Sequence, residues 1–598
     1  MNIKYILGGI LFTFAFSSCE DVLSTKTTFE LEDADVWHVP DLAKGVLHKA
    51  YQGIQTRPDC FDNNFLDCAT DNAVTNVYSS GVYKLGLGGM TSMDNPIANW
   101  ENCYKMIEYI NSFLENGLTD NTLYNRVDEE KDKKIKERLR GEALFLRAWW
   151  HFELLKMYGG KGTDGVALGI PYLNHFITQE EASNKGLFVR PTYAKTVDCI
   201  IDDLDEAMDL LPSDYTSSEE EFNNQQMGRA NKLAAAVLKS RVLVYSASPA
   251  YQDDDIVKIT GMGQYEVLNP DYYKSKWSVV AMEINKILSM QGFEDFTILN
   301  KTMIADAGTT PSDDFVFYKY FNTNALEKQQ FPPFYYGNAN TNPSHNLVMA
   351  FCSKENGFPA YDSRSGIDYN AEGFNMIDDL YSKLDNRFRL NVYTHKMLFG
   401  DSGEKIDILP GRKDSKEYSE NASRSGYYLA KFVSTKSKML NPIQTQTSPH
   451  YNPLLRKIEV FLNFAEAANE AWGPTDKKSC LYSAYDIMSD IRSTSTGIND
   501  DQYLESALTD ETEFRKLIQN ERRIEFAFEN QRYFDMRRWL LPLNETVQGV
   551  SVSLNDNNDE VFTVFDVEQR KYEIKNYYTP LPYDEVAKNS NLVNNFGW

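Results

Sequence analysis

Residues 140–158 read RGEALFLRAWWHFELLKMY, and this stretch decides the fold class. Its apolar side chains recur every three or four residues, which is the period of one face of an α-helix. The pattern extends back into a Lys-rich segment and stops at Gly159-Gly160, so it predicts an amphipathic helix over 132–158.

The helical pattern recurs along the chain, except in one long interval. A helix over 192–211 ends before Pro212, and a third over 229–246 carries almost no charge. Similar segments lie at 100–116, 277–290, 455–472, 480–494 and 512–540. The sequence therefore predicts a mainly α fold of tetratricopeptide-like helical pairs. These pack against an irregular, loop-rich region with few short strands, because helical periodicity fails over 295–455.

Composition narrows the class of protein. The chain has 598 residues with 86 acidic and 61 basic side chains, a net charge of −25. Because a surface this negative repels phosphate backbones, no nucleic-acid partner is expected. Aromatic residues make up 13% of the chain, and Tyr and Trp combine a flat apolar face with a polar tip, which suits sugars and protein interfaces.

The first residues predict export. An apolar run over 6–16 is too short to span a bilayer and is typical of a signal peptide, residues 1–18. Small residues precede Cys19, as in the lipobox of bacterial lipoproteins, so Cys19 is the predicted lipidation site. Glu20 and Asp21 follow it and resemble the surface-export signal of some Gram-negative lipoproteins, which implies an outer-membrane, surface-exposed protein. The alternative is a soluble secreted protein with a free Cys19.

The other cysteines and an acidic run raise two questions, whether a disulfide forms and whether a metal ion is bound. No CxxC pair or His-Cys spacing indicates a zinc site. Cys60 and Cys68 are close enough to form a disulfide, although free thiols are the alternative. Asp253-Asp254-Asp255 lacks the alternating spacing of a calcium-binding loop. No cofactor is predicted, and a structural calcium stays unassigned.

Several blocks resemble the SusD/RagB family, in order from Cys19 to Trp598. They are RGEALFLRAWWHFELLKMY at 140–158, RPTY at 190–193, GRA at 228–230, NPSHNLV at 342–348, FAEAANE at 464–470, ERRIEF at 521–526, RYFDMRRW at 532–539 and NSNLVNNFGW at 589–598. Ser344 and His345 depart from the family's pattern.

The resemblance implies an outer-membrane lipoprotein that captures oligosaccharides without cleaving them. Such a protein delivers its ligand to a SusC-like TonB-dependent transporter. It also implies one integrated fold over 19–598, with helical regions at 19–294 and 456–598 and a variable region at 295–455 that carries much of the ligand surface. A binder of peptides or another nutrient is an alternative within the family.

Two other classes remain as alternatives. A secreted carbohydrate-active enzyme would need two carboxylates flanking a sugar bond, and no GxSxG, HExxH or P-loop pattern is present. We therefore predict no enzyme. A helical scaffold for protein partners is the third class. The charged block at 521–538 mixes signs at helical spacings, which indicates structural ion pairs.

The glycan-binding residues are sought where aromatic and amide side chains lie outside helical periods. One such loop runs from 68 to 99 and the other from 315 to 342. Pro332-Pro333 and Gly337 bound an aromatic run in the second loop, where we expect a stiff turn that presents its rings. The predicted glycan-binding residues are Asp71, Asn72, Tyr83, Tyr320, Phe334, Tyr335 and Tyr336. For any one ring the alternative is that it fills the core of its own loop.

Overall fold

The computed structural model describes residues 33–598, with gaps at 370, 372–373 and 495. The predicted signal peptide and Cys19 lie outside the described residues. The helices of the first half are α1 (Asp33–His38), α2 (Pro40–Gln52), α3 (Gly81–Gly86), α4 (Trp100–Asn116), α5 (Glu129–Tyr158), α6 (Gln179–Ala182), α7 (Tyr193–Leu210), α8 (Lys232–Ala247) and α9 (Pro270–Leu288). Those of the second half are α10 (Lys301–Ile304), α11 (Ala325–Gln330), α12 (His345–Ala350), α13 (Arg387–Asn391), α14 (Lys457–Trp472), α15 (Ala484–Ser493), α16 (Gln502–Ser506), α17 (Glu511–Glu525), α18 (Arg532–Arg538) and α19 (Tyr583–Lys588).

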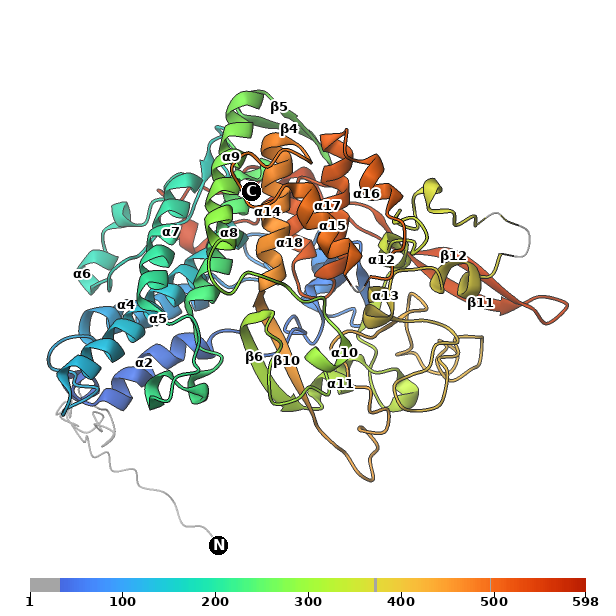
Figure 1. The fold of residues 1–598 in the computed structure, drawn as a ribbon, viewed down its shortest axis with the longest axis horizontal. Coiled ribbons are helices and arrows are strands. Elements are labelled where there is room, and N and C mark those ends of the chain that lie inside the picture. Colours follow the sequence, from blue (N-terminus) through green and yellow to red (C-terminus); the bar gives the residue numbers. More distant parts are fainter. Residues whose placement is uncertain (1–32, 370, 372–373, 495) are drawn as a thin grey trace, which may run out of the picture.

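The long helices pack in a row, each on the next. The row runs α2, α4, α5, α7, α8, α9, α14 and then α15 and α17, and Figure 1 shows it crossing the molecule from the blue helices to the orange ones. Because each helix buries a stripe on either neighbour, the row forms a continuous core, as in helical-repeat proteins. This confirms the predicted mainly helical fold.

The quoted stretch lies at the centre of this row. Almost every residue of α5 from Leu139 to Phe152 is buried. Arg147 crosses to α7, where its Nη2 lies 2.6 Å from Asp203 Oδ1, so the buried charge is paired. Gly141 is required by close approach, because a Cβ there would lie 2.9 Å from Leu211 Cγ.

The interval 295–455 is irregular, as predicted, and holds short elements. Its main strand, β6 (Phe315–Thr323), pairs antiparallel with β10 (Ser448–Arg456), which leads directly into α14. The remaining two-stranded sheets of the described chain are β1 (Ala73–Thr75) with β7 (Thr341–Pro343), β2 (Gly160–Lys161) with β3 (Ala167–Leu168), β4 (Val257–Gly261) with β5 (Gln264–Val267), β8 (Val392–Tyr393) with β9 (Tyr428–Leu429), and β11 (Thr546–Leu554) with β12 (Glu560–Gln569). The predicted divisions at 294 and 455 stay predictions.

One predicted helix is wrong. The segment 512–540 forms two helices, α17 and α18, because the chain turns between them. Phe528 and Asn530 adopt left-handed backbone conformations with φ of 61° and 58°. The Asn530 side chain stabilises the turn, since its Oδ1 accepts from Leu66 N (2.7 Å) and its Nδ2 donates to Pro58 O (2.8 Å). These partners are more than 460 residues away in the sequence, so no local pattern predicts the break between α17 and α18.

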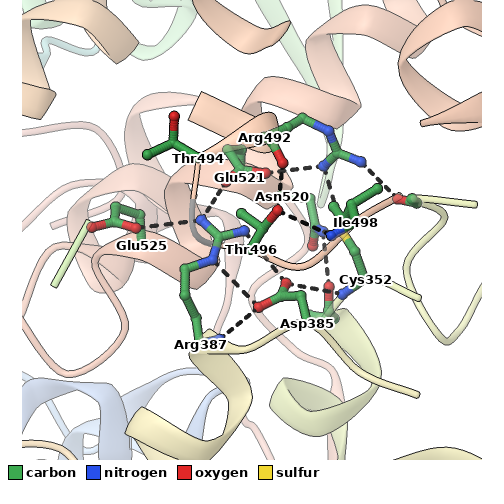
Figure 2. A network of polar contacts seen from close by, with 12 residues as sticks. Cys352, Asp385, Arg387, Arg492, Thr494, Thr496, Ile498, Asn520, Glu521 and Glu525 are labelled. Carbon is green, nitrogen blue, oxygen red and sulfur yellow. Dashed lines mark hydrogen bonds and ion pairs between the residues drawn. The ribbon is translucent and has the colours of Figure 1, made fainter. Parts of the chain in front are cut away.

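The charged block at 521–538 forms buried ion pairs (Figure 2). Glu521 on α17 accepts from Arg387 and lies 3.0 Å from Arg492 Nη1, and Arg387 also contacts Asp385 and Glu525. All these side chains are buried. The prediction of a structural network is confirmed for these residues, which lock α15, α17 and the segment 385–391 together.

The remaining sequence questions concern cysteines, metals and membrane spans. Within the described residues, Cys60 and Cys68 are free thiols, so they form no disulfide. Asp254 pairs with Lys161 Nζ (2.7 Å) and Asp253 accepts from Ala167 N (2.6 Å). No group of His, Cys, Asp or Glu in that part of the chain is arranged to hold a metal ion. The helices of the described segments are all too short or too polar to cross a bilayer.

Candidate functional site: an exposed aromatic surface

A short sheet brings the two predicted loops together. β1 lies within the first loop, and β7 lies at the end of the second. The two strands pair in the register Ala73 to Pro343 and Thr75 to Thr341. The contact continues beyond the strands, where Asn76 N donates to Asn340 O (2.9 Å). Two segments that are about 270 residues apart in the sequence are therefore adjacent in the fold.

A third segment, the loop 413–424, lies against both of them. Asn76 Nδ2 donates to the carbonyls of Asn421 (2.8 Å) and Ala422 (3.1 Å), which holds the loop to the first segment. Lys413 Nζ lies 4.9 Å from the centre of the Phe334 ring, and the Tyr418 ring packs 6.2 Å from that ring. The loop thus spans from the second predicted segment to the first.

These three segments expose a group of rings. We call Tyr78, Tyr83, Phe334, Tyr336 and Tyr418 the aromatic surface. Tyr78, Phe334, Tyr336 and Tyr418 are 58%, 40%, 60% and 53% exposed, and Tyr83 is half-buried. Large rings this exposed cost hydrophobic free energy, so several on adjoining segments indicate a binding surface.

Contacts within the surface hold two of the rings in place. Tyr78 and Tyr83 pack edge to face at 5.1 Å, and the Arg424 guanidinium lies 4.9 Å from the Tyr78 ring. Arg424 is itself fixed, because its Nη1 donates to Thr75 O (2.8 Å) and its Nη2 to Glu568 (2.9 Å). The rings are therefore preorganised, which reduces the entropy lost when a ligand binds.

Lys413 and Arg424 lie against the rings, and Lys416, from the same loop, lies near Asn76. Burial lowers the pKa of Lys416, and the nearby Arg424 lowers it further. Burial alone would lower the pKa of Lys413 too, but Glu404 and Tyr335 raise it overall, so Lys413 stays charged at neutral pH. The surface thus combines apolar ring faces with donors that suit hydroxyl or carbonyl oxygens.

Tyr335 lies behind the surface. It is 7% exposed, and its ring stacks on Phe399 at 4.2 Å. The turn also differs from the prediction, because Tyr336 takes the left-handed conformation (φ 67°) in place of Gly337. Gly337 is needed for another reason: a Cβ there would lie 2.2 Å from Phe331 O.

Tyr320 lies on a different element. It is 49% exposed on β6, and its ring packs 5.2 Å from Tyr451 on the neighbouring strand β10. Its predicted role in glycan binding stays a prediction, but the structure does not bring it to the aromatic surface.

Asp71 and Asn72 are buried and belong to a polar cluster. Arg532 donates to both oxygens of Asp71, at 3.0 and 2.8 Å, and Arg523 Nε donates to Asn72 Oδ1 at 2.8 Å. Burial opposes ionisation of Asp71, but Arg523 and Arg532 hold its pKa well below the ordinary value. Asn72 is fully buried and faces protein groups only.

The sequence reasoning missed Tyr418 and Arg424. Both lie in a polar segment with no period, and nothing local distinguishes them from the other residues there.

Two family models match the chain. The model described as "SusD family" matches residues 301–598, and the model described as "Starch-binding associating with outer membrane" matches residues 24–244. A SusD-like protein of Formosa agariphila is 22% identical and covers 99% of this chain and 98% of its own length. The chain belongs to the SusD family.

Solved SusD-like structures share the fold. A SusD-like protein from Bacteroides fragilis is 23% identical, with a TM-score of 0.71 over 95% of this chain and 99% of its own. A SusD-like carbohydrate-binding protein from the same organism is 20% identical, with a TM-score of 0.67 over 93% of this chain and 99% of its own. The prediction that the chain is not an enzyme fits the SusD family.

Proposed function

We propose that the protein is a cell-surface lipoprotein that captures oligosaccharides on the aromatic surface. It passes them to a SusC-like TonB-dependent transporter in the outer membrane. The observation that carries the proposal is the set of four exposed rings, from three chain segments, flanked by Lys413 and Arg424. A sugar ring stacks its C–H face on an aromatic ring while its hydroxyls bond to nearby polar groups.

The cell-surface location rests on the N-terminus and on the family. The leader and Cys19 indicate a lipid anchor, and a multiply acylated Cys anchors firmly because each buried CH₂ contributes about 0.8 kcal/mol. One matching family model is described as associating with the outer membrane. A carbohydrate-binding relative supports the ligand class.

Titration calorimetry with a panel of oligosaccharides tests the binding site. The panel includes maltoheptaose, cellohexaose and xylohexaose, with a mixed tripeptide pool as the probe for the alternative nutrient. We expect at least one oligosaccharide to bind, and Phe334→Ala or Tyr336→Ala to weaken it roughly 10- to 100-fold, or about 1–3 kcal/mol. Both rings are substantially exposed, so the melting temperature should change little.

Two matched variants make the test specific. Tyr320→Ala removes an equally exposed ring from β6 and should leave affinity unchanged. Tyr335→Ala removes a buried ring and should lower the free energy of unfolding by about 3–5 kcal/mol. Binding of peptides alone, or equal affinity in the wild-type protein and all four variants, would contradict the proposal.

Delivery to the transporter needs a separate experiment. Cells that express the protein with a SusC-like partner should take up the labelled oligosaccharide identified by calorimetry. Uptake at limiting concentration should fall with Tyr336→Ala and not with Tyr320→Ala. Uptake that is equal with and without the protein would refute the delivery step.

A further inference from the structure

A second concave site lies apart from the aromatic surface. It is a cavity of about 590 Å³, walled by α12, α17, α18 and the start of β11, with Tyr361 also in its lining. None of the five aromatic-surface residues lines it. Its volume falls within the roughly 300–1,000 Å³ typical of small-molecule sites. We call it the polar cavity.

The charged groups of the polar cavity balance. Arg523 and Arg532 provide two positive charges, and Asp71 and Glu545 provide two carboxylates. Asp71 is only 3% exposed, yet it is held ionised by the two guanidinium groups. A charged ligand would upset this balance in a partly desolvated site, whereas an uncharged one would not.

Arg523 lines the polar cavity with a side chain that is mostly enclosed by the protein. The Arg523 side chain is 9% exposed, and its Nη2 is buried without a hydrogen-bond partner. This nitrogen lies 3.0 Å from Asp71 Oδ2, but the geometry supports only an ion pair. Nη2 therefore faces Asp71, and a ligand in the cavity would meet the part of the guanidinium group that stays exposed.

The polar cavity is also lined by an exposed aromatic ring, that of Tyr361, and by the carboxylate of Glu545. Tyr361 is 55% exposed, and its backbone N donates to Met349 O (3.0 Å), which fixes its position on the cavity wall. Glu545 also lines the cavity, and because it is exposed its carboxylate oxygens are open to a ligand. Adjacent sugar hydroxyls donate to a carboxylate and accept from a guanidinium at the same time.

We propose that the polar cavity binds the end of an uncharged saccharide, one or two rings long, stacked on Tyr361 and hydrogen-bonded to Arg523 and Glu545. The inference rests on the proposed glycan-binding function for its ligand class, but it assigns a different site. Two separate sites let one molecule hold a glycan segment on the aromatic surface and a chain end in the cavity.

Short sugars test the polar cavity without involving the longer aromatic surface. The probes are maltose, cellobiose, lactose and xylobiose, with glucuronate as the charged counterpart, and the readouts are saturation-transfer NMR and crystals soaked with each probe. We expect at least one disaccharide to occupy the cavity and to bind more tightly than glucuronate. Tyr361→Ala should weaken it at least tenfold, and Tyr336→Ala should leave it unchanged.

Further variants separate recognition from folding. Tyr361 is exposed, so its loss should not unfold the protein; Arg523→Lys keeps the charge but loses the planar donor set, and should also weaken the disaccharide. An empty cavity with every probe, tighter binding of glucuronate, or binding indifferent to Tyr361→Ala would overturn the inference. If disaccharides bind here while oligosaccharide affinity ignores Phe334→Ala and Tyr336→Ala, the proposed aromatic site fails and this one stands.

Discussion

At the scale of single residues, Asp414 shows how the loop 413–424 depends on pH. Its side chain is 1% exposed, Oδ2 accepts from Asp407 N (2.8 Å) and Oδ1 has no partner. Burial raises its pKa from 3.8 to about 6. Because the folded state holds this proton more tightly than the unfolded state, the contribution of Asp414 to stability is greatest below pH 3.8 and falls as the pH rises to about 6.

Asp414→Asn should therefore stabilise the protein above pH 6. The amide keeps the acceptor for Asp407 N and removes the buried charge, and the pKa difference corresponds to at most about 3 kcal/mol. Urea unfolding at pH 7.5 should show a gain of about 1–3 kcal/mol that shrinks toward zero near pH 4. Asp556→Asn, which alters an exposed carboxylate on the β11–β12 turn, is the control and should show no such difference. A gain that is the same at both pH values would contradict this account.

At the scale of elements, the turn between α17 and α18 decides where the charged block goes. Without the break at Phe528 and Asn530, Arg532 could not reach Asp71 while Glu521 faces Arg387. One block of sequence thereby supplies both the buried network of Figure 2 and a wall of the polar cavity.

Substitutions at Asn530 separate the contribution of its side-chain hydrogen bonds from that of its left-handed backbone conformation. Asn530→Gly keeps the left-handed conformation available and loses two side-chain hydrogen bonds, so it should cost about 1–3 kcal/mol. Asn530→Ala loses the same bonds and adds about 1 kcal/mol of backbone strain. Chemical unfolding of both variants measures the difference. Equal stability of the glycine and alanine variants would show that the left-handed backbone contributes nothing.

At the scale of the whole molecule, the lipid anchor determines where the surfaces operate. Cys19→Ala should release the protein into the soluble fraction, because no acyl chains are attached and no described helix is suited to span a membrane. Fractionation followed by a high-salt wash measures this. Cys60→Ala alters a thiol in the folded part and should leave membrane attachment intact. A Cys19→Ala protein that resists the salt wash would rule out this anchor.

The sequence by itself determined most of the long helices of the core and the resemblance to the family. Residues 140–158 predict α5 because the residues that give a helical signal are neighbours in the chain, and the same holds for α7, α8 and α14. The local pattern predicted one continuous helix over 512–540, and this was wrong. The hydrogen bonds of Asn530 to Pro58 and Leu66 hold the chain in a turn between two helices. The Asn530 side chain bonds to a segment that the local sequence does not contain.

Only the tertiary structure decided which rings face solvent. Tyr335 and Tyr336 are neighbours in an aperiodic segment, yet one stacks on Phe399 and the other is 60% exposed. The β1–β7 pairing and the loop 413–424 assemble the aromatic surface from segments that are far apart in the chain. Outside regular elements no period links position to burial, so the exposure of each ring is set by long-range packing.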